Sequence, residues 1–302
     1  MAARLSAKET KHTKKPQWIA HSIAILFSIL CIIPFLIVIS SSLTNEFALN
    51  EHGYQLWPTF FDTTAYQYIF RNPRTIVNSY GVTILVTVAT TVLGVLFMAM
   101  IAYPLSRRNC KFRRFLSFYI FFTMLFSGGL VPGYILTTQY LHLKDNILVM
   151  IVPSLVNAFH VIMIRTFFQR LPGSLFESAK IDGASEFRIF FSIAMPLSVP
   201  VLASVAFFTA MGKWSDWYTA MLYINKEELV PLQYLLYRIQ NNLQVLLSAM
   251  TNVTGITINP RDLPGNNLIM AMAVVATGPM LFVFPFFQKY FVQGLTMGAV
   301  KG

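Results

Sequence analysis

The sequence predicts an all-α integral membrane protein with six transmembrane helices. Hydrophobic residues make up 55% of the 302 residues and charged residues only 12%, whereas a soluble domain carries about 25% charged residues. Six apolar runs are long enough to cross a hydrocarbon core of about 30 Å. An even number of crossings places both termini on the same side of the membrane. The runs are 19–43, 78–105, 115–136, 147–164, 197–223 and 268–287.

The six runs define one membrane domain over residues 17–293, with a short tail at each end. Residues 1–16 form a basic tail. The first run is too long for the core of a signal peptide and has no small-residue cleavage site close behind it, so we expect a retained helix. Residues 294–302 form a small-residue tail after the last helix.

Two long loops lie on the side of the membrane opposite the termini. The loop at 44–77 contains a short amphipathic stretch at 65–70. The segment 222–267 is polar and rich in Asn, Gln and Leu, and its part 229–247 has the apolar spacing of an amphipathic surface helix. Loops this long in a compact domain are usually functional. The alternative is a solvated loop that only covers helix ends.

The basic residues orient the chain in the membrane. Sixteen Lys and Arg lie on the side of the termini and seven on the opposite side. Because basic residues flank transmembrane helices mainly on the cytoplasmic side, we expect both termini, and the loop between the fourth and fifth runs, to be cytoplasmic. This distribution also accounts for the net charge of +11 without a nucleic-acid partner.

The loop between the fourth and fifth runs has the local signals of a helix, a sharp turn and a second helix. Ser174 followed three residues later by Glu177 has the form of a capping box, which predicts a helix from the next residue onward. Gly183 can adopt the left-handed conformation that ends this helix. Ser185 can cap a second helix, which Pro196 interrupts. Such a rigid knob is suited to docking in a groove of a partner.

The same loop resembles the cytoplasmic coupling loop of membrane subunits of type I ATP-binding-cassette (ABC) importers. That loop reads E-A-A, three residues, G, nine residues, I-x-L-P. Here Glu177-Ser-Ala is followed at the same spacing by Gly183 and by Ile193-Ala-Met-Pro, with conservative departures at Ser178 and Met195. The resemblance implies that this coupling loop, residues 172–196, contacts an ATPase subunit. It assigns the contact to Glu177, Ser178, Ala179, Asp182, Gly183, Ala184 and Pro196.

Three further segments resemble carbohydrate-uptake permeases of the maltose and oligosaccharide type. They are Leu229-Val-Pro-Leu-Gln, Phe287-Gln-Lys-Tyr-Phe and the ending from Gly294 to Gly302. The chain is similar to the smaller of two paired permeases, in the branch that takes up complex oligosaccharides or polysaccharide fragments. The resemblance implies four kinds of partner: a second, homologous permease, two ATPase subunits that bind ATP and Mg²⁺, an extracellular solute-binding protein and an oligosaccharide substrate. In the family the tail reaches between the ATPase subunits, a role that falls here on Gly298, Lys301 and Gly302.

The sequence lacks the motifs of an enzyme. No G-x-x-x-x-G-K-[ST] loop is present, so ATP hydrolysis by a phosphate-cradling loop has to come from another chain. We find no catalytic serine or zinc-protease motif, and Cys31 and Cys110 are too isolated to indicate a disulfide or a metal site. We therefore expect a non-catalytic subunit without a cofactor or metal of its own.

A few polar residues fall inside the runs. His160 is expected to be a neutral residue that forms a hydrogen bond between helices. Lys213 and Asp216 are three residues apart and can pair on one helix face; either they lie at the membrane surface, or they and the neighbouring Trp214 and Trp217 form an aromatic and polar wall of a sugar pathway. Tryptophan is also common at membrane interfaces for amphipathic reasons alone.

Alternative functions remain open at this point. An ABC permease for another class of solute would share the coupling loop. A secondary carbohydrate transporter or a channel would work without ATPase subunits, but ion-coupled carriers usually place acidic residues or histidine within their helices. The first, second, third and sixth runs carry no charged residue in their interiors. A membrane scaffold or membrane enzyme has no motif in its favour.

Overall fold

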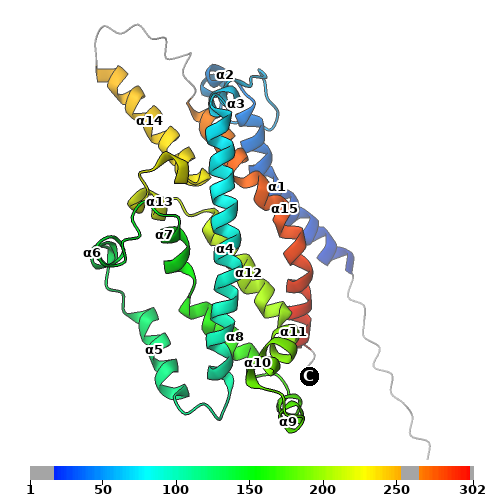
Figure 1. Ribbon diagram of the computed structural model, residues 1–302. Coiled ribbons are helices and arrows are strands. Elements are labelled where there is room, and N and C mark those ends of the chain that lie inside the picture. Colours follow the sequence, from blue (N-terminus) through cyan, green and yellow to red (C-terminus); the bar gives the residue numbers. More distant parts are fainter. Residues whose placement is uncertain (1–16, 253–264, 300–302) are drawn as a thin grey trace, which may run out of the picture. The chain divides into compact units, whose positions relative to one another are not determined.

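The computed structural model describes residues 17–252 and 265–299, almost entirely as helices (Figure 1). In these two ranges the only β pairing is an isolated bridge between Thr44 and Phe61. The predicted basic tail, residues 253–264 of the predicted loop and residues 300–302 lie outside the described residues. The all-α prediction is confirmed.

The helices of the described chain follow one another with short connections. In chain order they are α1 (Gln17–Ser42), α2 (Glu46–His52), α3 (Thr64–Ile69), α4 (Pro73–Ser106), α5 (Arg113–Leu125), α6 (Leu130–Ile135), α7 (Leu148–Ile151), α8 (Ala158–Phe168), α9 (Gly173–Ile181), α10 (Glu186–Ile189), α11 (Met195–Leu197), α12 (Val199–Trp214), α13 (Tyr218–Tyr223), α14 (Leu232–Asn252) and α15 (Asn266–Ala299). Two π-helical turns, Leu136–Tyr140 and Phe190–Ala194, and two 3-10 turns, Val152–Ser154 and Glu227–Leu229, lie between them.

The described chain holds up to six membrane spans by length and composition. Three of them are single helices, Trp18–Ser42, Pro73–Ser106 and Asn266–Gln288. The others are bent helix pairs: Arg113–Leu125 with Leu130–Tyr140, Leu148–Ser154 with Ala158–Phe168, and Glu186–Leu197 with Val199–Trp214. Each predicted apolar run falls on one of these six, so the number of crossings expected from the sequence fits the structure.

The third and fourth runs are each divided into two helices, bent by 113° and 46°, respectively. The fifth run begins at a bend of 80° between the end of the coupling loop and α12. Gly129, in the first break, has a φ of 87°, which is left-handed backbone that a right-handed helix cannot contain. Pro153 precedes the second break, and Ser198 occupies the third, directly before the first turn of α12, which contains Pro200. Proline and glycine are the usual causes of such kinks because they interrupt the helical hydrogen bonds.

The chain divides into two compact units, Met1–Tyr68 with Arg261–Val274, and Ile69–Pro260 with Val275–Gly302. In the first unit, Glu46 of α2 joins segments that are far apart in the sequence. Its two carboxylate oxygens accept hydrogen bonds from the backbone N–H groups of Asn266 and Asn267, at 3.0 and 2.9 Å. These N–H groups belong to the first turn of α15, where they have no partner within the helix. Glu46 therefore caps α15 from another element.

The second unit is built around α4, which packs against α8, α12 and α14. Its core consists of fully buried small and branched side chains, including Ala99 and Ala102 of α4, Val161 and Ile164 of α8 and Val205 of α12. Gly94 brings α4 close to the backbone after α7, since a Cβ there would lie 3.2 Å from the carbonyl oxygen of Leu155. Close helix packing through small residues is typical of membrane proteins.

Candidate functional site

The coupling loop is a helix, a turn and a second helix, as the sequence predicts. Helix α9 ends at Ile181, and Gly183 follows with a left-handed φ of 76°. Helix α10 begins after Ser185, whose hydroxyl oxygen accepts a hydrogen bond from the N–H of Arg188 at 3.3 Å. The π-helical turn Phe190–Ala194 and α11 continue the second helix through Pro196 to Leu197. The predicted interruption at Pro196 was therefore wrong by two residues, because the chain bends at Ser198.

The predicted start of the first helix was wrong. Helix α9 begins at Gly173 with Pro172 in the N-cap position, so Ser174 lies inside the helix and makes no capping hydrogen bond. The fixed φ of proline suits a helix start, and it moves the start upstream of the capping-box serine. Glu177 is therefore an exposed residue in the middle of α9.

The residues assigned to the ATPase contact differ in their exposure. Glu177, Ser178, Asp182 and Gly183 are exposed, whereas Ala179 and Ala184 are half-buried against the core. Two large apolar side chains project from the loop: Ile181 is 86% exposed and Phe187 69% exposed. Neither was expected from the sequence, although an isolated isoleucine between Lys180 and Asp182 is a recognisable signal.

A polar and aromatic network joins the end of α4 to α9 and α10. The Tyr103 hydroxyl donates a hydrogen bond to Glu186 Oε2 at 3.0 Å, and Lys180 Nζ lies 2.6 Å from Glu186 Oε1. The Arg107 guanidinium lies over the Phe176 ring, 3.3 Å from its centroid, and its Nη2 donates to the Tyr103 hydroxyl at 3.3 Å. Guanidinium stacked on an aromatic face is attracted by the ring electrons.

This network, comprising Tyr103, Arg107, Phe176, Lys180 and Glu186, borders a cleft of about 880 Å³. The cleft is lined by the ends of α4 and α8 and by both helices of the coupling loop. The network was not foreseen from the sequence, because Tyr103 and Glu186 are 83 residues apart. It means that the coupling loop is fastened to α4 and not only to its chain neighbours α8 and α12.

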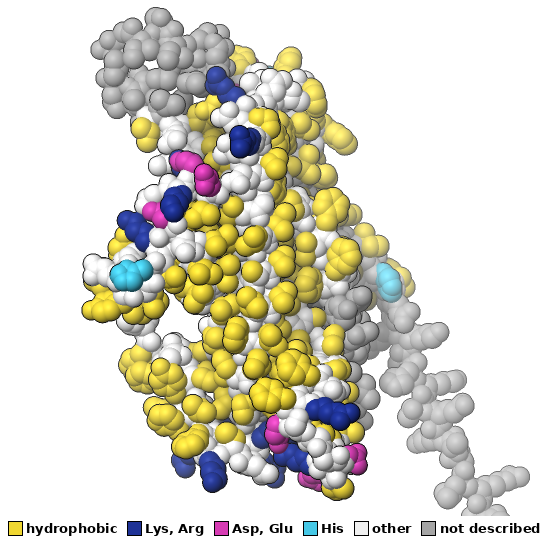
Figure 2. All heavy atoms as spheres, in the orientation of Figure 1, with side chains coloured by type: hydrophobic (Ala, Val, Ile, Leu, Met, Phe, Trp, Pro, Cys, Tyr) yellow, Lys and Arg dark blue, Asp and Glu magenta, His cyan; other side chains and the backbone are white. Residues whose placement is uncertain are grey.

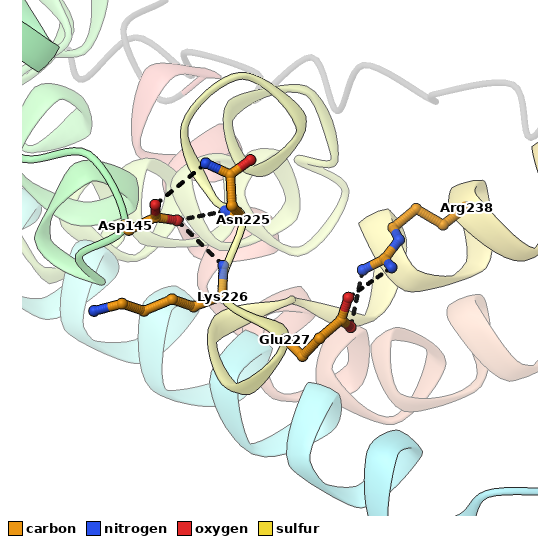
Figure 3. A network of polar contacts seen from close by, with 5 residues as sticks. All are labelled: Asp145, Asn225, Lys226, Glu227 and Arg238. Carbon is orange, nitrogen blue, oxygen red and sulfur yellow. Dashed lines mark hydrogen bonds and ion pairs between the residues drawn. The ribbon is translucent and has the colours of Figure 1, made fainter.

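A second polar network lies in the segments next to α7 and α14 (Figure 3). The Asp145 carboxylate accepts hydrogen bonds from the backbone N–H groups of Asn225 and Lys226, the second at 3.2 Å. These bonds, chiefly the one from the Asn225 N–H, lower the pKa of the Asp145 carboxyl. Arg238 of α14 holds Glu227 through two hydrogen bonds of 3.0 and 2.7 Å, which lower the pKa of the Glu227 carboxyl.

The predicted amphipathic helix of the long loop is present as α14. Leu232, Leu235, Leu236 and Leu243 are buried on one face, and α14 packs against α4. The Leu232 N–H donates to the Thr83 hydroxyl of α4 at 2.8 Å. The first half of the long loop is therefore folded onto the second unit.

The residues of the expected sugar pathway, Trp214, Asp216 and Trp217, differ from one another in burial and in their contacts. Trp214 is buried, and its Nε1 donates to the Ala276 carbonyl at 2.8 Å, which joins α12 to α15. Lys213 and Asp216 form the predicted pair, with Nζ and Oδ2 2.7 Å apart. Trp217 stacks on Tyr237 of α14 with ring centroids 4.3 Å apart. Trp214 thus has a packing role in this structure, and Trp217 is only half-buried.

The expectation for His160 was wrong. Its imidazole makes no hydrogen bond to any side chain or backbone group of the described residues, and its Nδ1 is buried without a partner there. The ring instead lies beside that of Phe208, with centroids 6.4 Å apart.

The three residues assigned to the tail are less well described. Helix α15 runs on to Ala299, so Gly298 belongs to a helix where a short tail was expected. Lys301 and Gly302 lie outside the described residues.

Comparisons with known proteins point to one family. Residues 95–297 match the family described as "Binding-protein-dependent transport system inner membrane component", and this range contains the coupling loop. The chain is 42% identical over 271 residues to "Protein LplC" of Bacillus subtilis (strain 168), covering 90% of both chains. It is 39% identical over 278 residues to "Polygalacturonan/rhamnogalacturonan transport system permease protein YtcP" of the same organism, covering 92% of this chain and 95% of that one.

A solved structure has the same fold. It is described as the crystal structure of a bacterial ABC transporter involved in the import of the acidic polysaccharide alginate. The similarity has a TM-score of 0.75 at 26% identity and covers 96% of this chain and 100% of that one. With its apolar helices and this family match over two thirds of its length, the chain is a multi-pass membrane protein that belongs to the family of binding-protein-dependent transport system inner membrane components.

Proposed function

We propose that this chain is one permease subunit of an ATP-driven importer that takes up oligosaccharides, such as fragments of plant or algal polysaccharides. The observation that carries the proposal is the coupling loop, which combines the spacing of the ABC-importer motif with an actual helix, left-handed turn and helix. The names of the relatives support the sugar class, since one is a polygalacturonan and rhamnogalacturonan permease and the solved structure is an alginate importer.

The importer requires partners that supply what this chain lacks. We assign them as a second, homologous permease, two ATPase subunits that bind ATP and Mg²⁺, and an extracellular solute-binding protein. This chain is then non-catalytic. The family description names a binding-protein-dependent system, which supports the last partner. The excess of basic residues on the side of the termini supports a coupling loop and termini in the cytoplasm.

The exposed residues of the coupling loop suggest how the ATPase is held. Ile181 and Phe187 project from the loop, and burying their apolar surface in a partner would contribute favourably to binding. We assign them, together with Glu177 and Gly183, to a groove of the ATPase subunit. ATP binding draws the two ATPase subunits together, and the docked loops follow.

The network around Tyr103 then passes this movement to the rest of the bundle. Because α4 packs against α8, α12 and α14, a displacement of α9 and α10 that carries α4 along reaches most of the second unit. ATP drives the change only to the extent that the ATPase pair binds one arrangement of the loops more tightly than the other. Helix α15 includes Gly298, and we assign Gly298, Lys301 and Gly302 to the interface with the ATPase subunits.

We assign the sugar pathway to Trp217 and Asp216. Trp217 is half-buried and neighbours the exposed rings of Tyr218 and Tyr237, which is an arrangement of aromatic faces suited to sugar rings. Trp214 holds α12 to α15 from behind. Accordingly, Trp217→Ala should lower oligosaccharide uptake without lowering the amount of assembled complex. Unchanged uptake in this variant would remove Trp217 from the pathway.

Site-directed cross-linking tests the proposed function directly. In a chain with Cys31→Ala and Cys110→Ala, a cysteine introduced by Ile181→Cys should cross-link to an ATPase subunit in intact cells and should resist a membrane-impermeant thiol reagent. A cysteine introduced by Tyr140→Cys, on an exposed residue of the opposite end of the third run, should show the reverse behaviour. Labelling of residue 181 from outside the cell would contradict the proposal.

Uptake measurements separate the remaining alternative. If the ATPase subunits are removed and radiolabelled oligosaccharide still enters the cell, the protein is a secondary transporter and not an importer subunit. Loss of uptake together with retained membrane insertion of this chain supports the importer.

A further inference from the structure

Two arginines from different helices meet at one uncharged group in the second unit. Arg113 begins α5, and Arg165 lies in the last turn of α8, against which α5 packs. With the Gln169 amide oriented so that its oxygen faces them, that oxygen accepts hydrogen bonds from Arg113 Nη2 at 2.9 Å and Arg165 Nε at 3.3 Å. The orientation follows from the hydrogen-bond partners. Two guanidinium groups therefore share a single neutral acceptor.

No acidic side chain among the described residues pairs with either arginine. No ion pair of the described chain involves Arg113 or Arg165. The first turn of α5 contains no acidic residue and no side-chain cap. The residue that follows Arg113 is a further arginine, Arg114. Both arginines are half-buried, so water screens their mutual repulsion less than it would on an open surface. The arrangement calls for an anion.

The surroundings indicate an anion attached to an apolar body. Phe112 and Phe115, on either side of Arg113, are both more than 60% exposed. Figure 2 shows hydrophobic side chains along α5 and dark blue basic side chains gathered at its lower end. A charged group in this position would be held by the arginines while an acyl chain lies along the phenylalanines. A phosphate group matches the planar, bidentate donors of arginine especially well.

We propose that Arg113, Arg165 and Gln169 form a binding site for the phosphate of an anionic phospholipid in the leaflet that faces the coupling loop. Basic pockets between transmembrane helices on this side of a membrane are a known mode of lipid recognition. The inference goes beyond the transport function, because it concerns the membrane and holds whether or not the importer carries sugar. A free phosphate ion offers the same charged group without the acyl chains, and the experiment distinguishes the two.

The test is native mass spectrometry of the purified full-length complex after incorporation in nanodiscs of phosphatidylcholine with a minor fraction of phosphatidylglycerol. Removing one arginine should lower the retention of phosphatidylglycerol by about fivefold, and removing both by about 25-fold, at the energy typical of one basic residue near an anionic surface. The variants are Arg113→Gln, Arg165→Gln and the double variant. Arg71→Gln, an exposed arginine on the other side of the membrane domain, is the matched control and should retain the lipid.

Two additional measurements keep the result interpretable. Variants with lysine at the two positions keep the charge but lose the planar donor pair, so they should retain an intermediate amount of lipid. Thermal unfolding in pure phosphatidylcholine, where no anionic lipid is present, should be unchanged in Arg113→Gln; if this variant unfolds early, the lysine variants carry the comparison.

The outcomes are distinct. Equal retention of phosphatidylglycerol by the wild type and the double glutamine variant would overturn the proposal. Displacement of the lipid by millimolar inorganic phosphate, with equal binding of phosphate in lipid-free detergent, would assign the site to a free anion instead of a phospholipid. Selective loss in the arginine variants, with no displacement by inorganic phosphate, supports the lipid site.

Discussion

Gly183 offers the most direct test of the coupling loop because a substitution there strains the backbone without disturbing any neighbouring side chain. Its φ of 76° lies in the left-handed region, and no heavy atom outside the adjacent residues lies within 4 Å of the position that a Cβ would occupy. Gly183→Ala therefore introduces conformational strain without a steric clash. The turn that it strains is closed by hydrogen bonds from the Gly183 N–H to Lys180 at 3.0 Å and from the Ala184 N–H to Ala179 at 2.9 Å.

The strain has a calculable size. A residue with a Cβ in left-handed backbone costs about 1–2 kcal/mol relative to glycine, and the ratio of the native turn to altered turns then falls by about 5- to 30-fold. Asparagine tolerates this backbone better than alanine. Valine, which is branched at Cβ, tolerates it less well. Coupled uptake should therefore decrease in the order Gly, Asn, Ala, Val at residue 183. The decrease from the wild type to the alanine variant should be no more than about 30-fold.

The assay is sugar uptake and ATP hydrolysis by the complex in proteoliposomes, with the amount of co-purified ATPase measured in parallel. Gly81→Ala is the control: Gly81 also has open space around it but lies within α4 without a positive φ, so uptake should not fall. Full uptake by Gly183→Ala, or an asparagine variant that is worse than alanine, would refute the reasoning.

Three further changes test other parts of the structure. Tyr103→Phe removes the donor of the 3.0 Å hydrogen bond, and Glu186→Ala removes its acceptor. Their effects on uptake per ATP hydrolysed should be non-additive by about 1 kcal/mol, roughly fivefold, in a double-mutant cycle; additive effects would show that the bond passes on no movement. Trp214→Phe removes the donor to Ala276 and should destabilise the complex by about 1–3 kcal/mol in a thermal unfolding assay, with uptake per assembled complex unchanged; a selective loss of uptake would return Trp214 to the sugar pathway. The Asp145 carboxyl has a lowered pKa, chiefly because of the Asn225 N–H, so its contact stabilises the fold above the unfolded pKa of about 3.9 and is lost as pH falls through the lower folded value. Hydrogen exchange at the Asn225 and Lys226 amides should thus be slow, and the free energy of the local opening that permits exchange should not change between about pH 5 and 8. Exchange should be faster in Asp145→Asn. Equal protection of these amides in both proteins would contradict the assigned contact.

The features that the sequence predicted correctly depend on neighbouring residues. Gly183 and Ser185 act on the backbone within three residues of themselves, and the apolar spacing of α14 reports which face is buried. The number of spans follows from composition, because length and hydrophobicity decide membrane insertion. The ion pair of Lys213 with Asp216 is also local, at a separation of three residues.

The features that were missed depend on contacts between distant segments or on competition between signals. Tyr103 and Arg107 contact the coupling loop only because α4 is folded against it. The break at Gly129 was readable from two consecutive glycines, but the apolar run around them suggested one continuous helix. Ser174 and Glu177 have the sequence of a capping box, but the helix begins two residues earlier because Pro172 takes the N-cap position.

The cap that Glu46 provides for α15 has a consequence for biosynthesis. Glu46 and Asn266 are 220 positions apart, and a ribosome adds about 5–20 residues per second, so α2 is exposed for roughly 10–40 s before its partner is translated. During that interval the carboxylate has to be hydrated or shielded by the insertion machinery. A chain that ends before the last crossing never acquires these two donors, so its Glu46 carboxylate stays without the partners that it has in the complete fold.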